Sequence, residues 1–320
     1  MAQIIALAFS DLHINLWSKF NKDNQRTFNG FKVMEIIAKR CEQLKVPALF
    51  CGDLFHKPET LDQELALIVQ TKFNGLSTIK WKMIAIEGNH DLQKVNSMDK
   101  LTNGWISFFS HYYKWLDNLD FNSTLIGDKY IIHGVPYIDH NIGLSKYLKE
   151  LPLQKGYKHI LLLHTDYPGA KDTDGRVVDS VENINLNALN RFDLILCGHI
   201  HKYQRLSKKV YMVGAPIQQR RTDKNCKMGY LEIYSDLSVK FVPLDFPKFI
   251  DVESEEEIKD DGNYYTIIPK ENHSKVEVID HKITKQLSKE KLAKRYMKAK
   301  GIKDEKKQKL LVKILKEAEQ

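Results

Sequence analysis

The stretch Ile4–His13, IIALAFSDLH, joins a run of six apolar residues to a short polar segment that contains Asp11 and His13. A continuous apolar run of this length is typical of a strand covered on both faces. Asp11 and His13 are two positions apart, so their side chains project to the same side of an extended segment. Because ligand sites of α/β proteins gather where the strands end, this stretch predicts a polar site at one edge of a sheet.

Four further polar segments come directly after short apolar runs. They are Gly52-Asp53 after Ala48–Cys51, Gly88-Asn89-His90-Asp91 after Met83–Ile86, His164 after Ile160–Leu163, and Gly198-His199-Ile200-His201 after Asp193–Cys197. Each segment alone is a weak signal, because such residues are common in surface loops. The five together predict a cage of carboxylate, amide and imidazole ligands for two metal ions, bridged by one carboxylate. A dinuclear cage of this kind usually cleaves phosphate esters.

The remaining pattern predicts the fold class as α/β. Further strands are expected at Lys129–Ile132, Val210–Val213 and Tyr230–Tyr234, and helices at Phe28–Leu44 and Leu61–Phe73, where apolar residues recur at helical spacing. We therefore expect a two-sheet α/β/β/α sandwich with mixed strands. The long stretch Thr165–Ile184 follows a candidate ligand and is expected to shape substrate access.

The composition indicates a soluble protein with a sizeable core. The chain has 320 residues, 42% of them hydrophobic, and no apolar run reaches the roughly 18 residues of a membrane span. The first residues lack a basic segment and a cleavage site, so they are interpreted as a core strand and not as a signal peptide. The four cysteines have no CxxC spacing, and Cys51 and Cys197 lie within expected strands. These features favour buried thiols and a cytoplasmic location.

The positive charge is concentrated at the C-terminus. Residues 281–320 contain fourteen Lys and Arg against five Asp and Glu, whereas residues 1–280 contain 35 against 36. We expect three parts: a body at 1–244, a small accessory β unit at 245–281 with strands at Tyr264–Ile268 and Lys275–Ile279, and a basic helical tail at 282–320. The tail's candidate partner-binding side chains are apolar or aromatic at helical spacing: Leu292, Tyr296, Leu311, Ile314 and Leu315. Docking on the chain's own body is the alternative for this face, and its lysines are expected to meet an acidic partner or DNA phosphates.

The five segments resemble the signature of calcineurin-like metallophosphoesterases. The strings Cys51-Gly52-Asp53-Leu54-Phe55-His56 and Gly214-Ala215-Pro216 further resemble the SbcD-type nuclease subunit of SbcCD complexes, the meiotic-recombination-eleven family, in its compact phage-like form. The resemblance covers the body closely and the last 75 residues or so only in layout. Two departures concern substrate fit: Ala215 stands where serine is common, and Leu92-Gln93 replaces the usual continuation after Asp91.

The resemblance implies a role for each site residue. One metal would be held by Asp11, His13, Asp53 and His201, and the other by Asp53, Asn89, His164 and His199. His90 would be the catalytic histidine beside the scissile phosphate, as acid or orienting group. His56 and Asp91 would lie just outside the metals or contact the substrate. The ions are expected to be Mn²⁺, with Mg²⁺, Zn²⁺ or Fe²⁺ as alternatives.

The resemblance also implies a function and partners. It predicts a double-strand exonuclease and single-strand endonuclease of DNA repair, recombination and replication, acting as a homodimer with an SbcC-type coiled-coil ATPase. The resemblance further implies the cytoplasm of a bacterium or of a phage-infected host. Arg220 and Arg221 are candidates for contacting DNA, whereas His133 and Tyr137 are expected to be structural. The alternatives are a phosphatase or cyclic-nucleotide phosphodiesterase of the same superfamily, and an inactive scaffold subunit.

Overall fold

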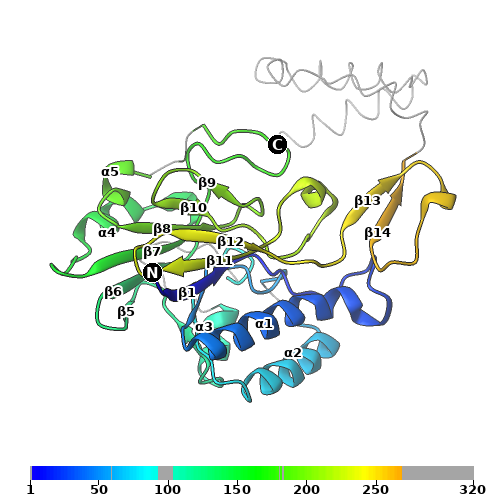
Figure 1. Ribbon diagram of the computed structural model, residues 1–320, viewed down its shortest axis with the longest axis horizontal. Coiled ribbons are helices and arrows are strands. Elements are labelled where there is room, and N and C mark those ends of the chain that lie inside the picture. The colour runs from blue at the N-terminus through cyan, green and yellow to red at the C-terminus, as the bar shows by residue number, and fades with distance from the viewer. Residues whose placement is uncertain (1, 59, 93–103, 180, 182–183, 269–320) are drawn as a thin grey trace, which may run out of the picture. The chain divides into compact units, whose positions relative to one another are not determined.

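The computed structural model describes all residues except 1, 59, 93–103, 180, 182–183 and 269–320. Two six-stranded sheets form the centre of the described chain (Figure 1). The first sheet has the order β12 (Val239–Pro243), β11 (Gly229–Tyr234), β1 (Ile4–Phe9), β2 (Ala48–Phe50), β3 (Met83–Ala85) and β4 (Leu116–Asn118). The second has the order β5 (Ser123–Ile126), β6 (Tyr130–Val135), β7 (Lys158–His164), β8 (Leu194–Gly198), β10 (Val210–Met212) and β9 (Gln204–Arg205).

Helices cover the outer face of each sheet. The first sheet packs against α1 (Gln25–Leu44), α2 (Gln63–Leu76) and α3 (Trp105–Ser110), and the second against α4 (Leu144–Glu150) and α5 (Leu186–Leu189). Short 3₁₀ turns are η1 (Lys22–Asn24), η2 (Asp139–Asn141), η3 (Arg221–Asn225) and η4 (Glu255–Glu257). The order of layers is therefore α/β/β/α, which confirms the predicted fold class.

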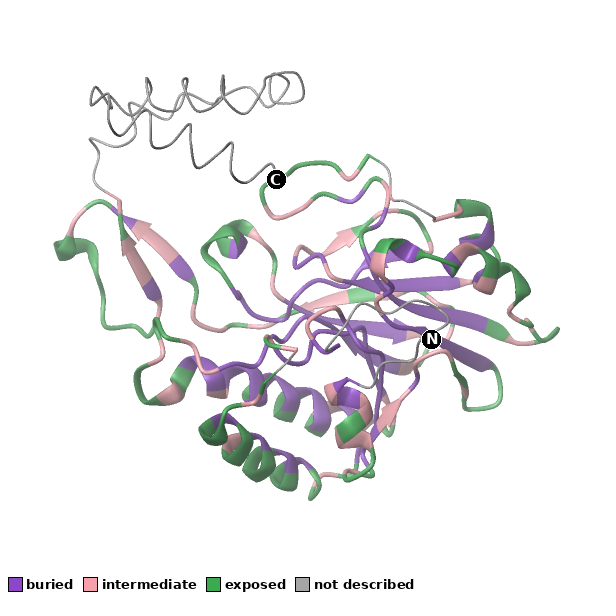
Figure 2. Cartoon of the chain, turned by 180° about the vertical axis from the view of Figure 1, so that it is seen from behind, coloured by how far each residue is buried: buried purple, intermediate pink, exposed green. Residues whose placement is uncertain are grey.

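The strands are apolar on both faces because each face meets a different core. In β1, Ala6 and Ala8 face the core between the two sheets, whereas Leu7 and Phe9 face the core under α1 and α2. In β7 the same alternation sends Ile160 and Leu162 between the sheets, and Leu161 and Leu163 toward α4 and α5. Figure 2 shows these buried strands in the middle of the body, with exposed residues on the outer sides of the helices. This double burial explains the continuous apolar runs in the sequence.

The parallel strands bring the predicted ligands to one edge. β1, β2 and β3 run parallel to one another, as do β6, β7 and β8. The segments that carry the candidate ligands follow the ends of β1, β2, β3, β7 and β8. All eight strands expected from the apolar runs of the body are present, with bounds shifted by at most a few residues.

The accessory β unit contains a strand that the sequence analysis missed. β14 (Tyr264–Ile267) pairs in parallel with β13 (Phe249–Val252), which lies within the acidic stretch between Asp245 and Asp261. The chain divides into a compact unit Met1–Ile267 and the remainder, Ile268–Gln320. The predicted boundaries at 244 and 281 stay predictions. The expected strand at Lys275–Ile279 lies outside the described residues.

The candidate partner-binding residues of the tail also lie outside the described part of the chain; they are Leu292, Tyr296, Leu311, Ile314 and Leu315. Within the described ranges, no helix combines the length and apolar character needed to span a bilayer. Cys41, Cys51 and Cys197 are buried free thiols, as the sequence predicted for Cys51 and Cys197.

Candidate metal centre

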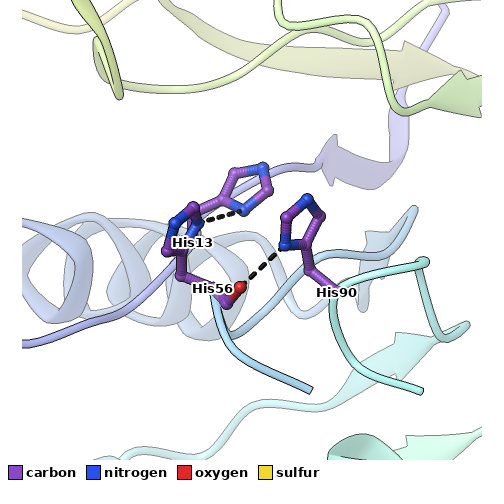
Figure 3. A group of neighbouring side chains, drawn as sticks. All are labelled: His13, His56 and His90. Atoms are coloured by element: carbon purple, nitrogen blue, oxygen red, sulfur yellow. Dashed lines mark hydrogen bonds between the residues drawn. The ribbon is translucent and has the colours of Figure 1, made fainter. Parts of the chain in front are cut away.

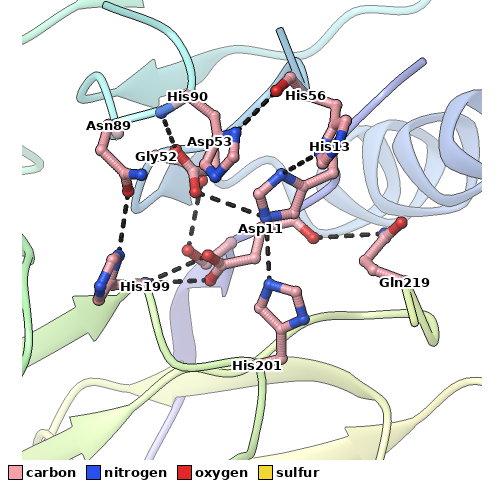
Figure 4. A network of polar contacts seen from close by, with 12 residues as sticks. Asp11, His13, Gly52, Asp53, His56, Asn89, His90, His199, His201 and Gln219 are labelled. Carbon is pink, nitrogen blue, oxygen red and sulfur yellow. Dashed lines mark hydrogen bonds and ion pairs between the residues drawn. The ribbon is translucent and has the colours of Figure 1, made fainter. Parts of the chain in front are cut away.

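The predicted ligands from the ends of β1, β2, β3 and β8 lie together in Figure 4, and His164 at the end of β7 lies with Asp53 and His199. Three groups of potential ligand atoms are each contained within 4.8 Å: Asp11, His13 and His201; Asp53, His164 and His199; and His13, His56 and His90. The first group contains the ligands that the resemblance implies for one metal, except the shared Asp53. The second contains those implied for the other metal, except Asn89. The structure therefore brings residues from both ends of the body's sequence, Asp11 and His201, into one site.

The first group is organised around two facing imidazoles. Nε2 of His13 lies 3.1 Å from Nε2 of His201. The Nδ1–H of His201 donates to the buried carboxylate of Asp223 over 3.1 Å, which leaves Nε2 with its lone pair. Asp11 is fully buried, and its carboxylate accepts the backbone N–H of His199.

At the second group, side-chain oxygen atoms of Asn89 and Asp53 lie next to histidine nitrogens. Oδ1 of Asn89 lies 3.1 Å from Nε2 of His164 and 3.0 Å from Nδ1 of His199. The Nδ1–H of His164 donates to the carbonyl oxygen of Cys51 over 2.6 Å, so that Nε2 faces the site. Oδ2 of Asp53 lies 3.4 Å from Nε2 of both His13 and His164. Asp53 is thus placed between the two groups, as a bridging carboxylate must be.

Four of the candidate ligands have left-handed backbone conformations. The φ angles are +55° at Asp11, +46° at His13, +61° at Asp53 and +86° at His199. Non-glycine residues adopt this region rarely and at a cost of about 1–3 kcal/mol each. Such strain persists only where the surrounding structure imposes it, and these four positions share one site, although eight other non-glycine residues of the described chain also have positive φ angles.

Burial decides the protonation of several imidazoles. Burial, reinforced by neighbouring histidines, lowers the pKa of His199 to about 3 and that of His56 to about 4. For His164, burial alone would lower the pKa, but the Asp53 carboxylate outweighs it and raises the pKa to about 9. Burial by itself would raise the pKa of Asp53, yet His164 and His13 hold it below its ordinary value. Asp53 is therefore charged at neutral pH, which is the form that binds a cation.

The donor set fits divalent cations. Nε2 of His13 and Nε2 of His201 lie 3.1 Å apart, and both can turn a lone pair to a cation bound beside them. The Asp53 carboxylate stabilises a proton on His164. A metal cation at the same position would be attracted by the same negative charge. Carboxylate, amide and imidazole donors without thiolate suit Mn²⁺, Mg²⁺, Zn²⁺ or Fe²⁺.

His90 belongs to neither of the two predicted ligand sets and lies close to His13 and His56 (Figure 3). Its Nδ1–H donates to the carbonyl oxygen of His56 over 2.7 Å, and its backbone N–H donates to Oδ1 of Asp53 over 2.8 Å. Its ring centroid lies 4.7 Å from that of His13. Nε2 is therefore the ring atom of His90 that can reach a bound substrate.

His56 and Asp91 support neighbouring residues. Nδ1 of His56 lies 3.4 Å from Nδ1 of His13, where it can accept the proton that fixes the His13 tautomer. Asp91 is fully buried, and its carboxylate accepts four backbone N–H groups, those of Asp53, Leu54, Phe55 and Gly88. These bonds tie the loop after β2 to the loop after β3. Asp91 therefore acts on the geometry of Asp53 and is closed off from any substrate.

Of the two candidate DNA-binding arginines, Arg221 begins the turn η3 and Arg220 directly precedes it. Arg221 pairs with Asp251 of β13 at 2.6 Å, and Arg220 lies 3.5 Å from Asp223. About half of each arginine side chain is exposed. The turn reaches the site through Asp223, which contacts His201. Contact of Arg220 and Arg221 with DNA stays a prediction.

Two residues of the site, Asp223 and Gln219, were missed by the sequence analysis. Asp223 positions His201, and Gln219 donates to the carbonyl oxygen of Leu12 over 2.7 Å, between Asp11 and His13. Neither belongs to a recognisable motif. Tyr137, interpreted as a packing residue, has its ring centroid 6.1 Å from that of His199. Tyr137 follows the strand β6, and its interpretation as a packing residue stays a prediction.

A two-sheet sandwich with this cluster of ligands at one edge defines a candidate dinuclear metal-dependent hydrolase. The chain belongs to the calcineurin-like phosphoesterase family, whose sequence profile matches residues 6–203. Membership implies metal-dependent hydrolysis of phosphate esters.

Comparison with solved structures finds distant similarity. One crystal structure aligns over 77% of this chain and 100% of its own, with 10% identity and a TM-score of 0.46. The crystal structure of TT1561 of Thermus thermophilus aligns over 75% of this chain and 99% of its own, with 13% identity and a TM-score of 0.42. No curated protein sequence matches the chain.

Proposed function

We propose that this protein is a DNA nuclease of the SbcD type, which hydrolyses phosphodiester bonds with two divalent metal ions, Mn²⁺ by preference. The observation that carries the proposal is the convergence of two ligand groups on Asp53, with His90 beside them and outside both sets. Bound cations would supply Lewis acidity, which polarises the phosphoryl oxygens and lowers the pKa of water.

The protein's own residues have separate tasks in this reaction. Asp53 holds negative charge between the two ligand groups, because both His13 and His164 face it. His90, held at Nδ1 and at its backbone N–H, presents Nε2 to offset charge on the phosphate or to protonate the leaving sugar oxygen. The bond between His56 and His90 fixes which nitrogen of His90 is available.

The choice of DNA over a small ester rests on the sequence. The Cys51–His56 string, Gly214-Ala215-Pro216 and the cationic residues 281–320 favour a nuclease subunit. The same features support an SbcC-type ATPase as the partner of the tail, a homodimer as the assembly and a role in DNA repair, recombination and replication.

The experiment offers the purified chain, with Mn²⁺, linear duplex DNA, single-stranded DNA and p-nitrophenyl phosphate. We expect cleavage of both DNAs, and loss of about a hundredfold or more in kcat for His90→Gln with Mn²⁺ binding unchanged. His111→Gln is the matched control, because His111 is exposed and bonds within its own helix. Turnover of the phosphomonoester alone would identify a phosphatase, and full activity of His90→Gln would remove the catalytic assignment.

A second experiment tests the partner. The full chain and a chain shortened to Gln286 are each co-expressed with an SbcC-type ATPase. We expect the shortened chain to keep Mn²⁺-dependent cleavage and to lose co-purification. Co-purification of both forms would refute the docking role of the tail.

A further inference from the structure

A cavity of about 220 Å³ opens beside the second ligand group. Its lining includes His199 on one side and Tyr137, Asp139 and Asp166 around it. His199 is the residue whose Nδ1 faces Asn89 (Figure 4), so the cavity shares a wall with the candidate metal centre. A group bound there would therefore lie beside the candidate metal centre.

Tyr137 forms an aromatic wall of this cavity. The ring is partly exposed and lies 6.1 Å from the His199 ring at an interplanar angle of 30°. The backbone N–H of Tyr137 donates to the carbonyl oxygen of Glu87 over 2.9 Å, just ahead of the Gly88–Asp91 loop. The Tyr137 hydroxyl lies 3.4 Å from Oδ1 of Asp139. These contacts hold Tyr137 in a fixed position beside His199 and beside the loop that carries Asn89.

The negative charge of the residues that line the cavity disfavours binding of a phosphate group there. The carboxylates of Asp139 and Asp166 both reach it, and none of its described lining residues is Lys or Arg. Asp166 lies 3.7 Å from Nε2 of His199, and about half of its side chain is exposed. Carboxylates repel phosphate and accept hydrogen bonds from N–H groups, so the lining suits a neutral ring that carries such donors.

The cavity is also pre-formed. The turn η2 that contributes His140 and Asn141 has left-handed φ angles of +49° and +51° at these two residues. The Thr165 hydroxyl, directly after His164, donates to Oδ1 of Asn141 over 3.0 Å and ties this turn to the end of β7. This bond holds the turn beside the end of β7, so the wall that the turn contributes is already in place.

We propose that this cavity binds one unpaired nucleobase next to the scissile phosphate, stacked on Tyr137 and hydrogen-bonded through its N–H groups to Asp139 or Asp166. The inference deepens the proposed nuclease function and rests on it. The volume lies below the roughly 300–1,000 Å³ of sites for drug-sized ligands, and it suits a single base. Because a paired base cannot enter, the enzyme requires a frayed end or a single strand at the cut.

The test uses single-stranded oligonucleotides in which one nucleotide lacks its base, with cleavage mapped at every bond. In the wild-type protein, we expect the bond that needs the missing base to be cut about tenfold more slowly than the same bond in the unmodified strand, because one base–aromatic stack is lost. Bonds far from the abasic position serve as internal controls.

Two variants separate binding from folding. Tyr137→Ala is expected to cut the normal and abasic strands at equal rates, with KM for normal DNA raised about tenfold. Tyr137→Phe keeps the ring and is expected to keep the discrimination. Mn²⁺ binding should be unchanged in both.

The outcomes distinguish this inference from the function on which it rests. Equal cutting of abasic and normal bonds by the wild-type protein would overturn the pocket and leave the nuclease intact. Discrimination that survives in Tyr137→Ala would do the same. A wild-type protein that cuts no DNA at any bond would remove both proposals.

Discussion

Replacing Asp223 by asparagine should weaken one metal site and spare the other. The Asp223 carboxylate accepts the Nδ1–H of His201 over 3.1 Å and the backbone N–H groups of Gln219 and Arg220 over 2.9 and 3.1 Å. Asparagine has nearly the same shape and one acceptor oxygen, so the turn can keep its backbone bonds. The negative charge that makes His201 a stronger ligand is lost.

The magnitude follows from this geometry. Mutation of a residue that orients a metal-bound histidine typically lowers metal affinity by about 10–100-fold. Because asparagine retains a neutral acceptor, we expect the lower end, about tenfold, equivalent to about 1.4 kcal/mol. The effect should fall on the site that contains Asp11, His13 and His201, since Asp223 touches no residue of the other group in the described chain.

Calorimetric titration with Mn²⁺ measures both sites. We expect two binding events in the wild-type protein, and in Asp223→Asn one of them weakened about tenfold with the other unchanged. Asp251→Asn is the matched control, because Asp251 pairs with Arg221 and Lys224 on the same turn without contacting His201. Equal Mn²⁺ affinity of Asp223→Asn and the wild type at both sites would refute the reasoning.

Three further perturbations test other parts of the structure. Gly88→Ala would drive a Cβ atom into Oδ1 of Asp53, so we expect loss of Mn²⁺ binding and a loss of about 2 kcal/mol of stability. Gly75→Ala is its control, because a Cβ atom there meets nothing within 4 Å. Normal Mn²⁺ binding by Gly88→Ala would contradict the expected clash with Asp53. Asp91→Asn leaves one acceptor for four backbone N–H groups, so urea denaturation should show a loss of about 3 kcal/mol, and an unchanged midpoint would show that these bonds carry little. Burial and the neighbouring His159 lower the pKa of His133 to about 4. Below about pH 6.5 His133 is therefore protonated in the unfolded chain, whereas in the folded chain it is protonated only below about pH 4. The free energy of unfolding should fall by up to about 3 kcal/mol as the pH falls across that window. His133→Gln should remove this part of the pH dependence, and identical pH profiles for variant and wild type would exclude it.

The structural role of His133 illustrates how a buried histidine can be satisfied without a metal. The Nε2–H of His159 donates to the carbonyl oxygen of Gln154 over 3.0 Å, so Nδ1 of His159 accepts from Nε2–H of His133 over 2.9 Å. Nδ1 of His133 then accepts from the Ser123 hydroxyl over 2.7 Å. Each ring nitrogen has one partner, and burial keeps the His133 ring neutral. The expectation that His133 is structural agrees with this chain of bonds.

The sequence by itself determined the parallel strands and the ligand types at their ends. A strand buried on both faces needs an unbroken apolar run, and such runs ahead of Asp11, Asp53, Asn89, His164 and His199 are visible without a structure. Strands with weaker patterns were missed, as in β13, where four residues lie in an acidic stretch and depend on β14 for pairing.

Only the tertiary structure decided how these ligands are held. Asp223 reaches His201, Asp91 gathers four backbone N–H groups, and Tyr137 lines a cavity beside His199. None of these contacts can be predicted from the spacing of apolar residues along one element. Each joins segments that are distant in the sequence and meet only after the sheets and loops have packed. Periodicity reports which face of an element is buried, whereas the partner of a buried carboxylate is set by how the sheets and loops pack.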